Sequence, residues 1–347
     1  MNFLRKILYP FSLIYGLIID LRNWAFDSGI LKTQEFDLPV IAVGNLNVGG
    51  TGKSPQIEYL IRLLQTTYKT AVLSRGYGRK TKGFLVANDD SDADQLGDEP
   101  FQFYRKFRNI CIAVDENRVH GIEQIQGACP EVELVLLDDA FQHRYVKAGL
   151  YVLLTAFGDL YVNDLVLPAG NLRESKRGAN RADIIVVTKC PVNLSKEDRI
   201  RIEKKLNPEP FQKVFFSTIA YQKIVSGNQK ELEIAELKNY SILLVTGIAN
   251  PAPIEDFLDQ NEIGFEHMRF GDHHRLTNME IQSISKKYAE MSGTKKIMLT
   301  TEKDFVRNFL EVDLPVYYLA IQTEFIEGEE DFNNLIINYV RKNKGNG

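Results

Sequence analysis

Short apolar runs recur along the chain and alternate with segments in which apolar residues return at helical spacing. In residues 56–65, for example, Ile57, Leu60 and Leu64 would share one face of a helix. Such an alternation of buried strands and amphipathic helices is typical of an α/β fold with a mostly parallel sheet. The strands are predicted at residues 38–43, 70–74, 84–87, 110–114, 133–139, 151–155 and 183–189, and again at 241–247, 265–270, 296–301 and 315–320.

The pattern changes at residues 211–234, where apolar and polar residues alternate around a turn at Gly227 and Asn228. Alternation of this kind predicts a β-hairpin, which we interpret as a hinge. The length of 347 residues also suggests about two domains. The predicted organisation is an N-terminal membrane-interface helix at residues 1–30, a larger α/β domain at 31–210, the hairpin hinge at 211–236 and a smaller C-terminal α/β domain at 237–347.

The N-terminal segment is unusual for a globular chain. An apolar run at residues 7–19 follows Arg5 and Lys6, and it is about two-thirds of the ~20 residues that a membrane span needs. It could be a helix in the membrane interface, with Trp24 at headgroup depth and basic residues on anionic lipid. It could also pack on the protein, or be a true span or a cleaved signal, although no small-x-small cleavage site follows. We expect the first of these.

Composition narrows the class of protein. Hydrophobic content of 44% and charged content of 25% are ordinary for a soluble globular chain. The net charge of −4 argues against general nucleic-acid binding, which favours a basic face. The cysteines, Cys111, Cys129 and Cys190, have no metal-ligand spacing, and we expect them to be reduced thiols in a cytosolic protein.

The strongest chemical signal is a glycine-rich turn at residues 44–55, between a predicted strand and a predicted helix. Backbone N–H groups of such a turn converge on phosphate oxygens, and the helix N-terminus adds partial positive charge. Lys53 would reach the terminal phosphates, and the Ser54 hydroxyl would ligate Mg²⁺. Asn47 stands where a P-loop has glycine, but Asn tolerates a left-handed backbone. The predicted nucleotide-binding residues are Asn47, Val48, Gly49, Gly50, Thr51, Gly52, Lys53 and Ser54.

A second signal is the apolar run at residues 133–139, which ends in Asp138 and Asp139. A buried strand that ends in a carboxylate is the Walker-B arrangement, in which the carboxylate meets the Mg²⁺ of a bound nucleotide. An Asp at a strand end is more often a cap, but the P-loop upstream favours a magnesium or water-positioning role. Residues 140–144 add polar groups beside the end of the strand predicted at residues 133–139.

The basic loop at residues 75–83 could hold phosphates or be a solvated turn.

A P-loop and a magnesium-binding carboxylate would suit a kinase, which transfers a phosphate group to a hydroxyl of its substrate. A kinase also needs a group that accepts the proton of this hydroxyl. Asp98 lies in a polar turn, His273 follows a carboxylate in a loop after a strand, and His143 is a weaker rival. A lone histidine is more often structural, so spacing alone leaves these candidates open. Residues 188–191 faintly resemble the guanine-reading Asn-Lys-x-Asp motif but lack its Asp, so no GTPase is inferred.

Taken together, these motifs resemble those of one family, the tetraacyldisaccharide 4'-kinases. The segments that carry the resemblance are residues 44–55, 74–78 (Ser-Arg-Gly-Tyr-Gly), 97–100 (Gly-Asp-Glu-Pro), 137–144, 167–174, 246–251, 270–274 and 300–304. They run in family order across nearly the whole chain. Each is weak alone, and the set is highly specific.

The resemblance implies a P-loop NTPase-type domain with a mostly parallel sheet and a smaller α/β domain, joined by a two-stranded hinge. It implies transfer of the ATP γ-phosphate to the 4'-hydroxyl of tetraacyldisaccharide 1-phosphate, with Mg²⁺, in lipid A biosynthesis. The enzyme would work at the cytoplasmic face of the inner membrane, bound peripherally or monotopically through its N-terminal helix, without a nucleic-acid partner.

The resemblance also implies roles for individual residues. The implied catalytic residues are Asp98, His273, Asp138 and Asp139; the implied metal ligands are Ser54 and Asp138; and the implied substrate contacts are Arg75, Gln142 and Arg173. Asp98 would pair with His273 to activate the hydroxyl, although the adjacent His274 is an alternative partner.

The chain departs from the family pattern at a few positions. Ser54 stands where Thr is common, Ala140 where Gly is common and Asn171 where Pro is common. None of these changes removes a group that the chemistry needs. Two other functions remain open, a P-loop kinase of a soluble metabolite and a nucleotide-driven switch without a phosphoryl acceptor.

Overall fold

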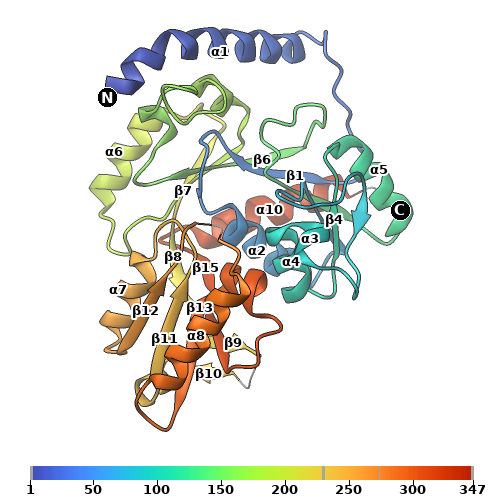
Figure 1. Cartoon of the computed structure of the whole chain (residues 1–347). Coiled ribbons are helices and arrows are strands. Elements are labelled where there is room, and N and C mark those ends of the chain that lie inside the picture. Colours follow the sequence, from blue (N-terminus) through green and yellow to red (C-terminus); the bar gives the residue numbers. More distant parts are fainter. Residues whose placement is uncertain (1–2, 229–230, 273, 345–347) are drawn as a thin grey trace.

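The structure is a computed structural model that describes residues 3–228, 231–272 and 274–344. Its larger sheet consists of β1 (Val40–Asn45), β2 (Thr70–Ser74), β3 (Leu85–Val86), β4 (Cys111–Val114), β5 (Leu134–Asp138), β6 (Leu150–Ala156), β7 (Ile184–Thr188), β8 (Lys213–Tyr221) and β15 (Ile321–Phe325). The strand order is β15-β8-β7-β6-β1-β5-β2-β4-β3 (Figure 1). The edge strand β3 pairs antiparallel with β4, and the edge strand β15 pairs antiparallel with β8. All the other neighbouring strands in this sheet pair parallel. β1, β2, β5 and β7 are buried along their length, so they appear in the sequence as continuous apolar runs.

Helices cover both faces of this sheet. They are α2 (Lys53–Leu64), α3 (Ala93–Leu96), α4 (Asp98–Lys106), α5 (Arg118–Ala128), α6 (Lys196–Leu206) and α10 (Glu329–Asn343), with 3-10 turns at Tyr161–Asn163 and Lys176–Arg181. Ile57 of α2, Phe103 of α4 and Phe332 of α10 share one apolar cluster with strand residues. Ile122 of α5 and Ile202 of α6 lie in other clusters, formed by the alternate residues of the strands.

The second sheet is smaller. It contains β9 (Ile224–Gly227), β10 (Leu232–Glu233), β11 (Ser241–Thr246), β12 (Phe265–Arg269), β13 (Lys296–Thr301) and β14 (Val316–Leu319), in the order β10-β9-β14-β13-β11-β12. Its helices are α7 (Ala252–Gln260), α8 (Asn278–Glu290) and α9 (Glu302–Asp304), with a 3-10 turn at Ile234–Asn239 and a π-helical turn at Phe305–Phe309. Two sheets of this kind confirm the predicted fold class.

The chain passes between the two sheets twice. β8 leads into β9, and β14 leads into β15; β8 pairs with β15, and β9 pairs with β14, both antiparallel. Two adjacent strands therefore connect the sheets. The hairpin predicted at residues 211–236 differs in detail, because β8 stays in the larger sheet and the antiparallel pair around the turn is β9 with β10.

The C-terminal elements also differ from the predicted division at residue 237. β15 and α10 follow that boundary, but β15 pairs with β8, and Ile336 and Val340 of α10 lie in the core of the larger sheet. Their apolar faces find partners on elements far away in the sequence, which the order of elements along the chain does not reveal.

The first helix, α1 (Phe3–Asp27), runs along the outside of the larger sheet's unit (Figure 1, dark blue). Its inner side contacts the protein, since Ser12 Oγ accepts a hydrogen bond from Ala169 N at 2.8 Å and the Tyr15 hydroxyl donates to Arg173 O at 3.1 Å. Large apolar side chains are exposed along it, namely Ile7, Tyr9, Phe11, Leu13, Ile14, Leu17, Ile18, Leu21 and Trp24. In the part of the chain that the structure describes, no helix is both long and apolar enough to span a membrane.

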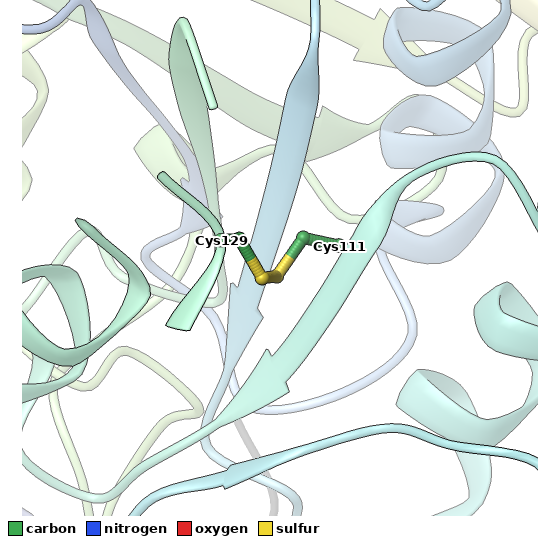
Figure 2. The surroundings of a disulfide bond; sticks show 2 residues. All are labelled: Cys111 and Cys129. Carbon is green, nitrogen blue, oxygen red and sulfur yellow. A yellow bond between two sulfur atoms is a disulfide. The ribbon is translucent and has the colours of Figure 1, made fainter. Parts of the chain in front are cut away.

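Two of the cysteines differ from the sequence expectation. Cys111 begins β4 and Cys129 follows α5, and the structure joins them in a disulfide (Figure 2). The prediction of reduced thiols is therefore wrong for this pair, whereas Cys190 is free and buried. The crossover through α5 returns the chain to the edge of the sheet where β4 begins, a proximity that sequence spacing does not show.

Candidate active site

The glycine-rich turn leaves β1 and enters α2. Gly49 (φ 124°) and Gly52 (φ 84°) adopt positive φ values that L side chains rarely adopt. Asn47 does not occupy the left-handed region, contrary to the role that its residue type suggested. It instead forms an isolated bridge with Leu172, and its Nδ2 donates to Asp159 Oδ2 at 3.3 Å.

The turn contains buried polar atoms without partners among the described residues. These atoms are Asn47 Oδ1 and Thr51 Oγ1. Unpaired buried polar groups are rare and costly, so their presence in a phosphate-binding type of turn indicates a polar ligand. The same turn contacts the end of β7, where Thr188 Oγ1 donates a hydrogen bond to Thr51 O at 2.7 Å.

Lys53 and the carboxylates at the end of β5 converge. Nζ of Lys53 lies 3.6 Å from Oδ1 of Asp139 and 3.4 Å from Oδ1 of Asn45. β1 and β5 are parallel neighbours with Val43 opposite Asp138, so both strands end at the same edge of the sheet. The structure therefore brings together the two strongest signals in the sequence.

Asp138 is buried, and its Oδ2 accepts a hydrogen bond from Ser74 Oγ at 3.0 Å. The pKa of Asp138 is raised to about 6, chiefly by burial and also by the neighbouring Asp139 and Glu99, while Lys53 and the Ser74 hydrogen bond oppose the shift. A nearby divalent cation would reverse this penalty. Within the described ranges, no group of three or more His, Cys, Asp or Glu residues could hold a metal ion. Nucleotide-bound Mg²⁺, however, needs only one or two carboxylates besides the phosphates.

Arg173 and Gln142 lie at the same edge of the sheet. Asp139 has a positive φ of 48°, and both of its carboxylate oxygens accept from Arg173 Nη1 at 3.0 Å. Nε2 of Gln142 donates to Asn45 O at 2.8 Å and to Glu174 Oε1 at 2.9 Å. Two of the three predicted substrate contacts, Arg173 and Gln142, thus lie close to the Lys53 and Asp139 pair.

Arg118, which the sequence analysis did not find, fixes the end of β5. It is buried, and its guanidinium donates to Asp115 O at 2.6 Å and to Asp138 O at 3.1 Å. Burial lowers the pKa of Arg118 to about 10, which leaves it charged near neutral pH. Nε2 of His143 accepts from Arg118 N at 3.3 Å, and burial lowers the pKa of His143 to about 4, so His143 is a weak base. Arg75, exposed after β2, contributes to lowering both pKa values, which places it near this cluster.

Asp98 is the first residue of α4. Gly97, before it, packs so closely on the loop after β2 that an added Cβ would lie 2.9 Å from Tyr77 O. This approach brings the start of α4 to the strand end that carries Ser74. Oδ2 of Asp98 accepts from Arg307 Nε at 3.0 Å and from Arg307 Nη2 at 2.6 Å.

The predicted histidine partner of Asp98 cannot be placed. His273 lies outside the described residues, so its pairing with Asp98 stays a prediction. His274, the alternative, has its Nε2 2.9 Å from Glu280 Oε1 and its ring stacked on Phe270.

Two lysines near the turn were also missed. Lys189 has a positive φ of 56°, and its Nζ lies 3.7 Å from where a Cβ on Gly50 would be. Burial lowers the pKa of Lys189, and Lys303 lowers it further. Nζ of Lys303 lies 2.8 Å from Glu99 Oε1. The faint motif at residues 188–191 was a signal for Lys189, and Lys303 lies in the segment 300–304 that carries the family resemblance, but no role was predicted for either lysine.

Known proteins of one family are similar to this chain over almost its whole length. A family model described as Tetraacyldisaccharide-1-P 4'-kinase matches residues 4–341. The tetraacyldisaccharide 4'-kinase of Flavobacterium johnsoniae is 50% identical over 345 residues, which cover 99% of this chain and 99% of the relative. The one of Bacteroides thetaiotaomicron is 45% identical, over 99% of this chain and 95% of the relative. Among solved structures, LpxK from Aquifex aeolicus in complex with ATP matches with a TM-score of 0.77 and 29% identity, over 97% of this chain and 99% of that chain.

Proposed function

The chain belongs to the tetraacyldisaccharide-1-P 4'-kinase family, and from this premise we propose that it is an ATP-dependent lipid kinase. It transfers the γ-phosphate of ATP to the 4'-hydroxyl of a tetraacyldisaccharide 1-phosphate, a step of lipid A biosynthesis. The observation that carries the proposal is the approach of Lys53 to Asp139 beside the glycine-rich turn. Phosphoryl transfer needs a phosphate-binding loop and strand-end carboxylates in one site.

The triphosphate of ATP lies in the turn from Asn47 to Ser54. Backbone N–H groups of the turn bind phosphate oxygens, and Lys53 adds positive charge where negative charge develops. The unpartnered buried Oγ1 of Thr51 supports a polar ligand at this place. Ser54 and Asp138 would hold Mg²⁺, whose charge stabilises the phosphate oxygens. The buried carboxylate of Asp138, with its raised pKa, fits that cation.

The acceptor binds beside Asp139. Asp98, with His273 as its predicted partner, accepts the proton of the 4'-hydroxyl, and Asp139 belongs to the same catalytic group. Arg75, Gln142 and Arg173 contact the phosphorylated substrate. Arginine suits this role, because its planar guanidinium can donate two parallel hydrogen bonds to two oxygens of one phosphate group.

Membrane binding through α1 would bring the protein to its lipid. The exposed apolar side chains of α1 would enter the membrane interface, while polar residues hold the helix to the site loops. Asn23 Nδ2 donates to Glu174 Oε2 at 3.0 Å, and Ser175 Oγ donates to Asp20 Oδ1 at 2.7 Å. We place the protein on the cytoplasmic face of the inner membrane, as a peripheral or monotopic protein, because ATP is available there. The two sheets are the cores of two domains that close over the reactants and exclude water.

Transfer of labelled phosphate tests the function. With γ-labelled ATP, Mg²⁺ and the disaccharide 1-phosphate lipid, we expect labelled lipid from the wild type but not from Lys53→Ala or Asp98→Ala. Lys204→Ala removes an exposed lysine of α6 and serves as the control, with unchanged activity expected. Activity that survives unchanged in Asp98→Ala would remove Asp98 as the base.

The two remaining functions predict different outcomes of the same experiment. A kinase of a soluble metabolite would label no lipid and would stay in the soluble fraction without detergent. A nucleotide-driven switch would hydrolyse ATP and label no acceptor.

A further inference from the structure

Ion pairs cross the contact between α4 and the segment that follows β13. Lys106 Nζ lies 2.9 Å from Glu302 Oε1, Lys303 Nζ lies 2.8 Å from Glu99 Oε1, and Arg307 Nη2 lies 2.6 Å from Asp98 Oδ2. α4 packs on the larger sheet, and the segment of α9 and the π-helical turn packs on the second sheet. This contact therefore connects the proposed base to the second sheet.

Arg307 is held rigidly in this contact. Its side chain is 3% exposed, and besides Asp98 it reaches Asp304, whose Oδ1 lies 3.4 Å from Nη1. Asp304 is fixed in turn, because its Oδ2 accepts from Gly247 N at 2.9 Å and from Thr301 Oγ1 at 2.8 Å. The guanidinium therefore has a defined position relative to the ends of β11 and β13.

The contact with Asp98 is asymmetric. Nε and Nη2 of Arg307 both donate to Oδ2 of Asp98, whereas Oδ1 has no hydrogen-bond partner among the residues that the structure describes. Two donors on one oxygen restrict rotation of the carboxylate and leave the other oxygen for the proton of a hydroxyl. Buried ion pairs seldom stabilise a protein more than apolar packing does, so stability alone is a weak reason for this arrangement.

We propose that Arg307 is a positioning residue for phosphoryl transfer. It directs Oδ1 of Asp98 toward the acceptor hydroxyl and makes that direction depend on where the second sheet lies relative to the first. The inference rests on the proposed function, in which Asp98 accepts the proton.

Arg105 provides a matched control for loss of the contact itself. Its guanidinium lies 5.6 Å from the ring centroid of Phe305, so Arg105 crosses the same contact from α4. No hydrogen bond in the described part of the chain joins Arg105 to Asp98. Arg105→Ala should lower the melting temperature and leave kcat within about twofold of the wild type.

The experiment measures kcat, the KM values for ATP and lipid, and the melting temperature. The proteins are the wild type, Arg307→Ala, Arg307→Lys, Arg105→Ala, Asp98→Asn and the double variant Asp98→Asn/Arg307→Ala. We expect Arg307→Ala to lower kcat about 10- to 100-fold, with the KM for ATP within about twofold, because a misplaced catalytic group costs rates of this order. Arg307→Lys keeps the charge but loses the two-point contact, so its kcat should lie between those of Arg307→Ala and the wild type. The double variant should be no slower than Asp98→Asn.

Each alternative outcome has one meaning. If Arg307→Lys and Arg307→Ala lose thermal stability but keep the wild-type kcat, Arg307 is a structural residue and the inference is overturned, while the proposed function stands. An additive loss in the double variant also overturns it, because Arg307 would then act independently of Asp98. If Asp98→Asn has the wild-type kcat, the base assignment and the inference both fail. If the wild type labels no lipid, the proposed function itself fails.

Discussion

Replacing Leu17 and Leu21 with serine should release the protein from lipid vesicles. The two side chains are one helical turn apart on the outer face of α1, and they are 71% and 61% exposed. Full burial of a leucine side chain is worth about 1.5–3 kcal/mol, so insertion of the exposed fractions contributes about 1–2 kcal/mol each. The double variant should therefore bind about 30- to 1,000-fold more weakly, from a loss of about 2–4 kcal/mol.

Sedimentation with vesicles of anionic phospholipid measures this partitioning. The matched control is the double variant Val192→Ser/Met279→Ser, which removes two side chains that are each 79% exposed but lie away from α1. It should bind vesicles like the wild type. Equal vesicle binding by the wild type and Leu17→Ser/Leu21→Ser would refute the role of α1 in membrane docking, as would an equal loss in the control.

Three further predictions concern the site and the cysteines. Because burial holds the pKa of Asp138 at about 6, above its ordinary value of 3.8, its ionisation costs stability as the pH rises from about 4 to about 6. Asp138→Asn should then be up to about 3 kcal/mol more stable than the wild type at pH 7 but not near pH 4 in urea unfolding, and parallel pH dependences would contradict this. Denatured, unreduced protein should show one reactive thiol, Cys190, whereas three thiols would mean that Cys111 and Cys129 are reduced. Arg173→Ala should raise the KM for the lipid acceptor with little change in the KM for ATP, because the Arg173 guanidinium contacts Asp139 and is proposed to bind the acceptor; steady-state kinetics with an unchanged lipid KM would refute this.

The sequence located the central strands well. The strand predicted at residues 70–74 has the same bounds as β2, and the one predicted at 296–301 has the same bounds as β13. Strands that are buried on both faces contain few polar residues, so they stand out as apolar runs between polar turns. The glycine-rich turn was equally visible, because positive φ values at Gly49 and Gly52 require a residue type that the sequence displays.

Long-range packing was less visible. The sequence placed β15 and α10 in the second unit, but their partners are β8 and the core of the larger sheet. The disulfide of Cys111 with Cys129 depends on where the crossover through α5 ends, and the ion pair of Asp98 with Arg307 joins residues on different sheets. Each contact is decided by how whole elements pack, not by residues within one turn of helix or strand.

The sequence by itself determined the α/β alternation, the glycine-rich turn and the carboxylates at the end of β5, because these follow from local periodicity and backbone chemistry. The tertiary structure alone decided that Lys53 meets Asp139 and that α1 lies with its polar side on the site loops. It also decided that Arg307 reaches Asp98 from the second sheet. The physical reason is that side-chain distances between remote segments are set by sheet order and helix packing, and these depend on the burial of apolar surface over the whole chain.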